Sequence, residues 1–358
     1  MKFLTIKRAD INRDLWDAFV DVSDEAWLYH RFDLQDTIAT WPGKIDTSFA
    51  ITDSGAEGNI LALMPLHRLE DPDGKVFSLN SLGGPAFANN LGKNQKRKVM
   101  NHLQNHILSL ASKYDVQFID VALSPMAPAY RGERCPRVNP LLHLGYENTL
   151  TQSYVIDLRL SEEEIWEKIH SYCRTHIRKA EKEGCAVRQA STFSDIETYY
   201  DIHCETYHRT GVPPHPFEYF KAIWENCTTK GFSRIFLAEN NGRIVAADNE
   251  AVYKNAMSGW TAAGRIEASK IGANNLLHWH AIRWARQNGC EWYESGEGFP
   301  NFKEGKEKGL SDFKKSFGGE LYPFYRGRIT IEKKQNPYEE IWRHFSKILH
   351  NIRIIMKI

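Results

Sequence analysis

The alternation of apolar and polar positions is clearest between residues 232 and 319. Two short apolar runs, Arg234–Ala238 and Arg243–Ala247, flank the turn sequence Asn240-Asn241-Gly242. An Asn-Gly turn between two such runs predicts a β-hairpin. A third β-prone run covers residues 251–260, and the small residues Thr261-Ala262-Ala263-Gly264 are expected to end it. The pattern therefore predicts three consecutive strands.

A helix and a fourth strand are predicted directly after this group. Apolar residues recur at helical spacing over residues 276–285, behind the glycine Gly272, and the run 290–294 reads as a buried strand. The order strand, strand, strand, helix, strand resembles the core of the GNAT acyltransferase fold. In that fold free N–H groups at the helix start hold a pyrophosphate, so the resemblance makes Gly272 and Ala273 candidates for cofactor binding.

The first half of the chain shows a similar order of elements. They are a largely helical segment, a hairpin, a strand, a helix and a strand, over residues 11–45, 48–64, 76–81, 94–113 and 116–121. The simplest interpretation is an internal repeat of one α/β unit. The second copy should begin with one helix, because Ser161 and Glu164 form a capping box and an apolar stripe continues to Gly184.

Composition excludes several classes of protein. The chain has 358 residues, 42% of them hydrophobic, and a formal net charge of +1, so no global charge attracts nucleic acid. Its six cysteines are scattered without a Cys-x-x-Cys pair, which is typical of reduced intracellular thiols. The first residues lack a signal-peptide core, and no run approaches the roughly 18 apolar residues of a membrane span. We therefore expect a cytoplasmic protein.

Two short motifs resemble one family. The segment Phe313-Lys314-x-x-Phe317-Gly318 and the segment Arg174–Ala180 are similar to stretches of the Fem-like transferases, which belong to the GNAT acyltransferase superfamily. The resemblance implies an α/β fold of tandem GNAT-like domains, each a mixed, mostly antiparallel sheet flanked by helices, with the acceptor cleft between them. The predicted boundaries are 1–150 for the first domain, 151–330 for the second, and 331–358 for a C-terminal amphipathic helix.

Basic residues supply the candidates for substrate binding. Arg174 and Arg178 lie four apart on one helix, where guanidinium groups could bind the diphosphate of a precursor or the tail of a tRNA; a solvated helix face explains the same pattern. Arg209 begins an Arg-x-Gly-x-Pro turn similar to one that borders the substrate cleft in the family, although a surface connection shaped by its prolines explains the same sequence. Lys303 lies in a glycine- and lysine-rich loop that could close over substrate, although a plain solvated loop would have the same composition.

The catalytic candidates follow from the resemblance and from position. The family lysine at the place of Lys314 is expected near the transferred group. Backbone N–H groups on the third strand, around Trp260, are expected to meet the oxyanion, and Trp260 is expected to contact substrate. The base that takes the proton of the amine is assigned to Glu294, by position only, from a set that also contains Asp248, Glu250 and Glu297.

No metal is expected. His102 and His106 lack a third ligand, and His278 and His280 point to different sides of a helix. The donor is left open between acyl-CoA and aminoacyl-tRNA. The sequence Lys270-Ile271-Gly272-Ala273 departs from the usual CoA signature, and the long helical hairpin common among users of aminoacyl-tRNA is missing.

The predicted function is transfer of an acyl or aminoacyl group onto an amine of a cell-envelope precursor, either a nucleotide- or lipid-linked sugar or a muropeptide of peptidoglycan synthesis. Two alternatives are an acyl-CoA-dependent N-acetyltransferase acting on an amino sugar, as in polysaccharide clusters, and a non-catalytic sugar-nucleotide binding protein. The apolar face of residues 337–358 is explained either by docking onto the protein's own core, which we favour, or by peripheral contact with the inner membrane face.

Overall fold

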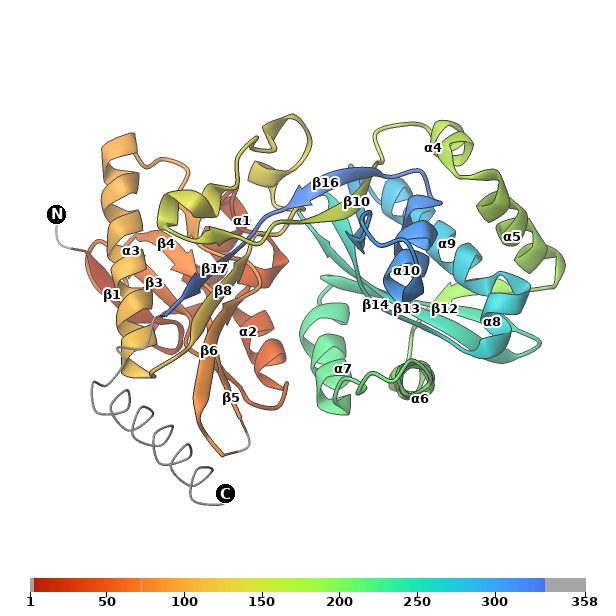
Figure 1. The fold of residues 1–358 in the computed structure, drawn as a ribbon, viewed down its shortest axis with the longest axis horizontal. Coiled ribbons are helices and arrows are strands. Elements are labelled where there is room, and N and C mark those ends of the chain that lie inside the picture. Colours follow the sequence, from red (N-terminus) through yellow and green to blue (C-terminus); the bar gives the residue numbers. More distant parts are fainter. Residues whose placement is uncertain (1–2, 72, 332–358) are drawn as a thin grey trace, which may run out of the picture.

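The protein folds into two lobes joined by a ribbon of long strands (Figure 1). The computed structural model describes residues 3–71 and 73–331. The first lobe, residues 3–150 and 325–331, holds two sheets. One has the order β1-β3-β4-β7, with bounds Leu4–Lys7, Phe49–Thr52, Ile60–Met64 and Ala86–Phe87. The other has the order β2-β5-β6-β8-β17-β9, with bounds Lys44–Asp46, His67–Glu70, Val76–Ser81, Phe118–Ala122, Arg326–Thr330 and Glu147–Asn148.

The second lobe, residues 151–324, is built on a single sheet. Its order is β11-β12-β13-β14-β15-β10-β16, with bounds Ala186–Gln189, Ser233–Asn240, Arg243–Tyr253, Ala256–Gly264, Trp292–Gly298, Thr151–Asp157 and Glu320–Phe324. The strands pair antiparallel except β14 and β15, which are parallel. This lobe contains all nine predicted site residues, and two of them, Trp260 and Glu294, lie on the sheet itself.

The internal repeat is present in both lobes. In the first, β6 pairs parallel with β8, and helix α3 (Lys93–Lys113) connects them. In the second, β14 pairs parallel with β15, and helices α8 (Ile266–Ile271) and α9 (Ala273–Gln287) connect them. Each parallel pair follows an antiparallel hairpin, β5–β6 or β13–β14. The predicted tandem arrangement is confirmed.

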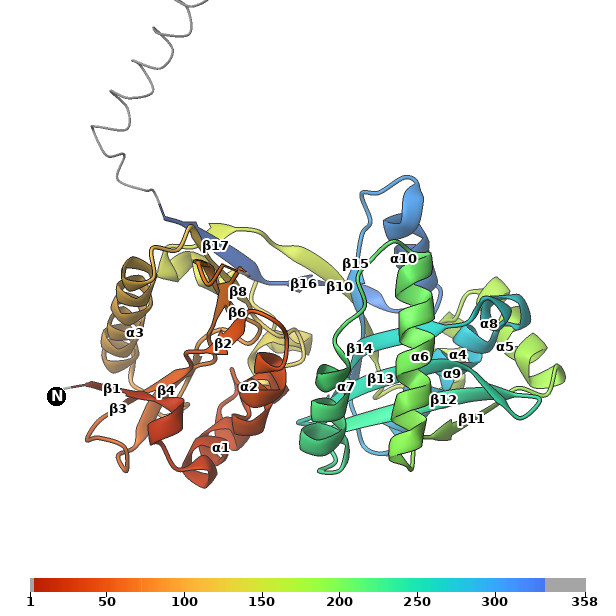
Figure 2. The same ribbon diagram turned by 90° about the horizontal axis from the view of Figure 1, so that it is seen from below.

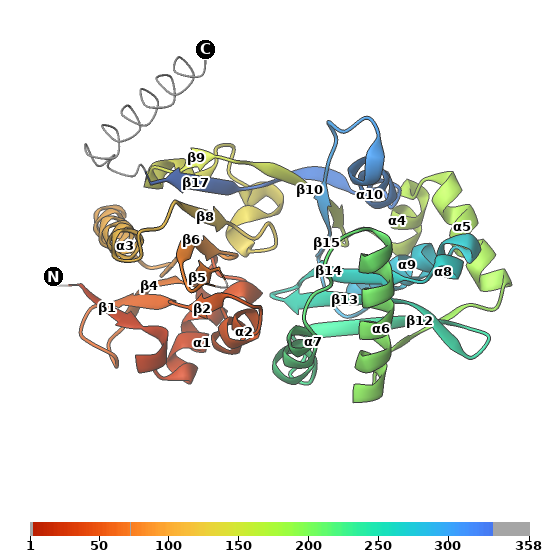
Figure 3. The same ribbon diagram turned by 60° about the horizontal axis from the view of Figure 1, so that its bottom comes forward.

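Two strands are exchanged between the lobes, as Figure 3 shows in the ribbon that runs across the top of the molecule. Strand β10 follows the first lobe in sequence but lies beside β15 in the sheet of the second. Strand β17 follows the second lobe but lies beside β8 in the first. The last strand of the range 151–330, β17, thus belongs to the sheet of the first lobe. The domain boundaries at residues 150 and 330 stay a prediction.

Helices cover both faces of the second sheet. On one face α5 (Ser171–Lys182) packs on α9, because its apolar stripe of Cys173, Ile177 and Ala180 is buried there. On the other face lie α6 (Phe193–Arg209) and α7 (Phe217–Ile223) (Figure 2). α7 also contacts α2 (Phe32–Ala39) of the first lobe. Helix α1 (Arg13–Val22) precedes α2 in the same lobe.

Three local predictions need correction. The helix that begins at the Ser161 capping box ends at Lys168 as α4 (Glu162–Lys168), because Ile169 is extended, and α5 starts anew. The run 251–260, predicted as one strand, contains a turn at Lys254 and Asn255, so its start belongs to β13, and β14 continues past Trp260 through Gly264. The glycine- and lysine-rich loop contains a helix, α10 (Gly305–Lys315).

The predicted C-terminal helix lies outside the described residues. Among the described residues, no helix is both long and apolar enough to cross a lipid bilayer.

Candidate active site

Strands β14 and β15 separate into a fork at the centre of the second lobe. They are paired only at their first residues, from Ala256↔Trp292 to Ser258↔Glu294. Beyond Ser258, β14 stays paired with β13 and no longer pairs with β15. Backbone groups on this side of β14 are therefore free of strand partners, which is the arrangement expected for donors to an oxyanion.

Glu294 and Lys314 lie near each other at this fork, where their charges interact without a direct ion pair. Glu294 is 6% exposed and accepts a short hydrogen bond from the hydroxyl of Ser258. Burial raises the pKa of Glu294, while the Ser258 bond and the charges of Lys314 and Arg326 oppose the rise. The Nζ of Lys314 donates to the Glu297 carbonyl oxygen at 2.8 Å. The structure thus brings the two predicted catalytic residues together.

The ammonium group of Lys314 is itself partly withdrawn from water. Burial lowers its pKa, and the nearby carboxylates of Glu294 and Glu297 act in the opposite direction. Lys314 also lies against the backbone of Gly296, whose φ of +94° an L side chain rarely adopts. A side chain at Gly296 would stand 2.8 Å from Nζ, so the glycine leaves room for the ammonium group.

The first lobe reaches this fork through Tyr29. Its phenol is buried, and both burial and the charge of Glu294 raise its pKa. The ring of Tyr29 packs edge-on against Trp260 at 6.3 Å between centroids, and the indole N–H of Trp260 donates to the hydroxyl of Tyr219 at 2.9 Å. Trp260 therefore lies where the two lobes meet, and its contact with substrate stays a prediction.

A pocket of about 520 Å³ opens beside this contact. It is lined by Tyr29, by the ends of β6 and β8, and by Arg326 and Arg328 from β17. Arg328 is paired with Asp120 through two hydrogen bonds of 2.7 and 2.8 Å. Arg326 forms a 3.2 Å ion pair with Glu297, and its buried Nε has no partner. Phe324 of β16 also lines it, and the remaining lining residues belong to the first lobe, including its crossing strand β17. We call this space the interlobe pocket because the crossing strand β17 forms one of its sides.

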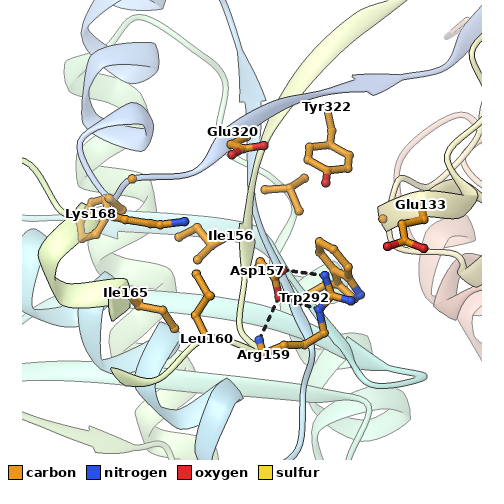
Figure 4. Close-up of a pocket in the computed structure, with 14 residues that line it drawn as sticks. Glu133, Ile156, Asp157, Arg159, Leu160, Ile165, Lys168, Trp292, Glu320 and Tyr322 are labelled. Atoms are coloured by element: carbon orange, nitrogen blue, oxygen red, sulfur yellow. Dashed lines mark hydrogen bonds and ion pairs between the residues drawn. The ribbon is translucent and has the colours of Figure 1, made fainter. Parts of the chain in front are cut away.

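A second pocket, of about 350 Å³, lies on strands β10, β15 and β16 (Figure 4). Trp292 and Tyr322 face each other in it at 6.2 Å, and Arg159 stacks on Trp292 while its guanidinium is paired with Asp157. Glu133 of the first lobe closes one side. Trp292 and Glu294 lie two apart on β15, so they share one face of the sheet.

Arg174 and Arg178 do not line the space between the lobes. The buried stripe of α5 faces α9, so its basic face is turned outward, on the side of the second lobe far from the first (Figure 1). Arg174 donates to the Trp166 carbonyl at 3.3 Å, and Arg178 stacks on the Trp166 ring at 5.3 Å. Both arginines therefore make contacts within their own lobe, and their role in substrate binding stays a prediction.

The remaining predicted residues are more scattered. Arg209 ends α6 and donates to the Gly264 carbonyl at 2.9 Å, at the end of β14. Lys303 is exposed in the loop before α10. Gly272 joins α8 to α9 with a φ of +83°, and the space above it is filled by the backbone of His176 on α5. Ala273 is fully buried at the first position of α9.

None of the nine predicted site residues, all within the described part of the chain, lines either pocket. Tyr29 and Arg326 were missed because they belong to the first lobe and to the exchanged strand. Their proximity to Glu294 depends on the packing of the lobes, for which one sequence gives no local signal.

Comparisons with known proteins agree with this architecture. Residues 168–304 match the model of the acetyltransferase (GNAT) domain. No curated protein matches the chain. Among solved structures, FemX is similar with a TM-score of 0.67 and 15% identity, covering 91% of this chain and 97% of its own. L-PGS from Bacillus licheniformis has a TM-score of 0.55 and 15% identity, covering 92% and 95%.

A tandem GNAT protein from the clavulanic acid biosynthesis pathway, solved without AcCoA, has a TM-score of 0.55 at 9% identity and covers 93% of this chain and 100% of its own. The Fem-like, tandem GNAT fold predicted from the sequence is therefore confirmed. The domain match supports acyl-group transfer as the general chemistry.

Proposed function

We propose that this tandem GNAT protein with the Fem fold transfers an acyl or aminoacyl group from an activated carbonyl donor onto an amine of a cell-envelope precursor held between its lobes. The observation that carries the proposal is the fork of β14 and β15, where buried Glu294 and Lys314 lie near each other beside the interlobe pocket. Two opposite charges in a partly desolvated site interact more strongly than they would in water.

The proposed mechanism uses the fork as the reaction centre. The neutral amine of the acceptor attacks the carbonyl carbon, and the negative charge that develops on the carbonyl oxygen is met by backbone N–H groups of β14 beyond Ser258 and by the ammonium group of Lys314. Glu294 accepts a hydrogen bond from the amine and holds it in line for attack. Burial raises the pKa of Glu294, and its position next to Lys314 favours the ionised form needed for this role.

The interlobe pocket supports an acceptor that carries an anionic group. Arg326 and Arg328 both line it, and guanidinium groups bind phosphate and carboxylate with paired hydrogen bonds. Asn80 and the Tyr29 ring offer polar and aromatic contacts suited to a sugar or a peptide. A nucleotide- or lipid-linked envelope precursor has both kinds of group.

The GNAT domain match favours an acyl-CoA thioester as the donor, and an aminoacyl-tRNA is the second donor of the proposal. The start of α9, where GNAT proteins are expected to hold a pyrophosphate, is closely packed against α5 in this chain. Lys179 of α5 also donates to the Lys270 carbonyl at 2.7 Å, just before α9. Binding of CoA at this position therefore has to fit beside α5.

A donor screen tests the proposal. Purified protein is incubated with acyl-CoA or aminoacyl-tRNA, with nucleotide-linked amino sugars and muropeptide precursors as acceptors, and products are followed by mass spectrometry. Lys314→Met is compared with Lys315→Met, which removes the adjacent, exposed lysine of the same helix. We expect Lys314→Met to lower kcat by about 10²–10³, the loss typical of removing one oxyanion donor, and Lys315→Met to leave it within about threefold.

Two results would count against the proposal. Equal activity of the two lysine variants would remove Lys314 from the reaction. Binding of acceptors without turnover in any donor arm would favour a non-catalytic binding protein.

A further inference from the structure

A chain of buried polar side chains runs from the fork into the core of the second lobe. The ring Nε2 of His278 on α9 lies 3.4 Å from the Ser295 Oγ, and its Nδ1 lies 3.2 Å from the Tyr293 hydroxyl. The Tyr293 hydroxyl donates to the Glu250 Oε1 at 2.7 Å. With Nδ1 protonated, every hydrogen in the chain has one acceptor: Ser295 donates to His278, His278 to Tyr293, and Tyr293 to Glu250.

The inner end of this chain is a pair of carboxyl groups. Glu250 is fully buried, Asp248 is 5% exposed, and neither has a hydrogen bond or ion pair to a lysine or arginine among the described residues. Burial and the charge of Asp248 raise the pKa of Glu250. The Glu250 Oε2 has no protein donor. A proton shared by the two carboxyl groups satisfies that oxygen and avoids two adjacent buried charges.

The outer end of the chain lies at the fork. Ser295 follows Glu294, the last residue of β15 that pairs with β14, and its carbonyl oxygen is 3.6 Å from the position of a Cβ on Gly259. Ser295 and His278 are 6% and 7% exposed, so the chain is almost closed to bulk water. Ser295 points to the opposite face of β15 from Glu294, so an amine held by Glu294 has to lie in the opening between β14 and β15 to reach the Ser295 hydroxyl. This is the place where the proposed acceptor amine must lose a proton.

We propose that Ser295, His278, Tyr293 and the Asp248–Glu250 pair form the proton-accepting site for an amine bound at the fork. The inference rests on the proposed acyl transfer and extends it with the missing base. In this proposal the relay residues take the proton from the amine, and Glu294 orients the amine.

The proton transfer balances along the chain. As the amine nitrogen bonds to the carbonyl carbon, its proton passes to the Ser295 Oγ, the hydroxyl proton of Ser295 to His278 Nε2, and the Nδ1 proton to Tyr293. Tyr293 passes its proton to Glu250, and the proton on Glu250 Oε2 moves to Asp248. The bond from the carbonyl carbon to the donor's sulfur or oxygen breaks, and that leaving group takes a proton from solvent.

The neighbours of His278 support a relay rather than a simple ion pair. Strand β13 contributes Asp248, whose Oδ2 is 3.7 Å from Nδ1, and β15 contributes Tyr293 and Ser295. Helix α10 and the turn after it contribute the rings of Phe313 and Phe317, with centroids at 5.7 and 4.4 Å. The imidazole is therefore held in place by aromatic packing while both nitrogens keep polar partners.

The test compares two buried tyrosines. Tyr293→Phe interrupts the relay, whereas Tyr146→Phe removes the hydroxyl of a similarly buried tyrosine in the first lobe, outside the relay and away from β14. His278→Asn is a second interruption. Circular dichroism and thermal unfolding confirm that each variant is folded. The kcat and KM of transfer are then measured from pH 6 to 9, with the donor and acceptor found in the screen.

We expect Tyr293→Phe and His278→Asn to lower kcat by about 10²-fold or more with KM within about threefold, because general-base assistance contributes 10²–10⁴. Their loss should shrink as the pH rises, because hydroxide increasingly removes the proton in place of the relay. Tyr146→Phe should keep its rate and pH profile. Equal losses in Tyr293→Phe and Tyr146→Phe, or an unchanged pH profile in His278→Asn, would overturn the relay.

Two further outcomes are separable. A wild-type protein that transfers no acyl group refutes the proposed function and the relay with it. Ligand atoms of Asp248, Glu250 and His278 lie within 4.8 Å of one another, so elemental analysis of the purified protein is included. One bound divalent ion per chain would mean that a metal, not a shared proton, neutralises the carboxyl pair, and it would overturn the relay alone.

Discussion

Substitution of Gly272 by alanine separates a structural role of this glycine from a role in ligand binding. Gly272 has a φ of +83°, in the left-handed region that costs an L residue about 1–2 kcal/mol. An added Cβ would also overlap the carbonyl oxygen of His176 and stand 3.0 Å from its carbonyl carbon. These atoms are backbone, so the helices α5 and α9 would have to move apart.

The magnitude follows from these two terms. Forcing an extra methyl group into a packed contact costs typically about 1–3 kcal/mol, which adds to the strain of the left-handed backbone. We therefore expect Gly272→Ala to lower the free energy of unfolding by about 2–5 kcal/mol. That is a large part of the roughly 5–15 kcal/mol available to a folded protein.

The chain offers a matched control in Gly242. Its φ is +72°, and a Cβ there would meet nothing within 4 Å. Gly242→Ala should therefore lose only the backbone term, about 1–2 kcal/mol. Urea unfolding of both variants, followed by fluorescence of the ten tryptophans, measures the difference. If Gly272→Ala is no less stable than Gly242→Ala but binds acyl-CoA more weakly, the glycine serves the ligand and the packing argument is refuted.

Two further predictions concern buried titratable groups. Arg188 holds the pKa of Asp195 well below its usual value, so the stability from this pair is present above about pH 4, the unfolded pKa, and is lost as the pH falls through the folded pKa. Asp195→Asn should cost about 1–3 kcal/mol at pH 7 in urea unfolding, and the gap to wild type should close toward pH 2. Burial raises the pKa of Cys227 to about 12. At pH 8 iodoacetamide should label Cys227 at least about 100-fold more slowly than the half-buried Cys204, as peptide mass spectrometry would show; comparable rates would mean that the Cys227 region opens readily.

Turn chemistry explains which strands could be predicted from the sequence. The hairpin at Asn240-Asn241-Gly242 is present because Asn241 and Gly242 both adopt positive φ, as the sequence pattern implies. The next turn was missed, although Lys254 and Asn255 also have positive φ. Lysine is not a turn signal, so the sequence predicts one strand from residue 251. The structure instead shows that the chain reverses within this run.

The glycine and lysine content of the segment after Glu294 predicts a loop, but residues 305–315 form α10. Ser311 on this helix is hydrogen-bonded to Tyr154 of β10, and Phe313 packs on the core of the second lobe. Tertiary packing outweighs the weak helix propensity of Gly305 and Gly309. Lys314 consequently lies on the last turn of a helix, which fixes its ammonium group at the fork more firmly than a loop would.

Exchange of β10 and β17 explains why the candidate site could only be predicted in part. Glu294 and Lys314 belong to one continuous unit, in which position alone indicates Glu294 and the resemblance of the Phe313–Gly318 motif indicates Lys314. Arg326 begins the strand that crosses into the first lobe, and its ion pair with Glu297 at 3.2 Å ties that crossing to the fork. Because β10 and β17 carry part of both sheets, a movement of one lobe relative to the other would change the distance from Arg326 to Glu294. Substrate that moves the lobes should therefore change the interlobe pocket and the fork together.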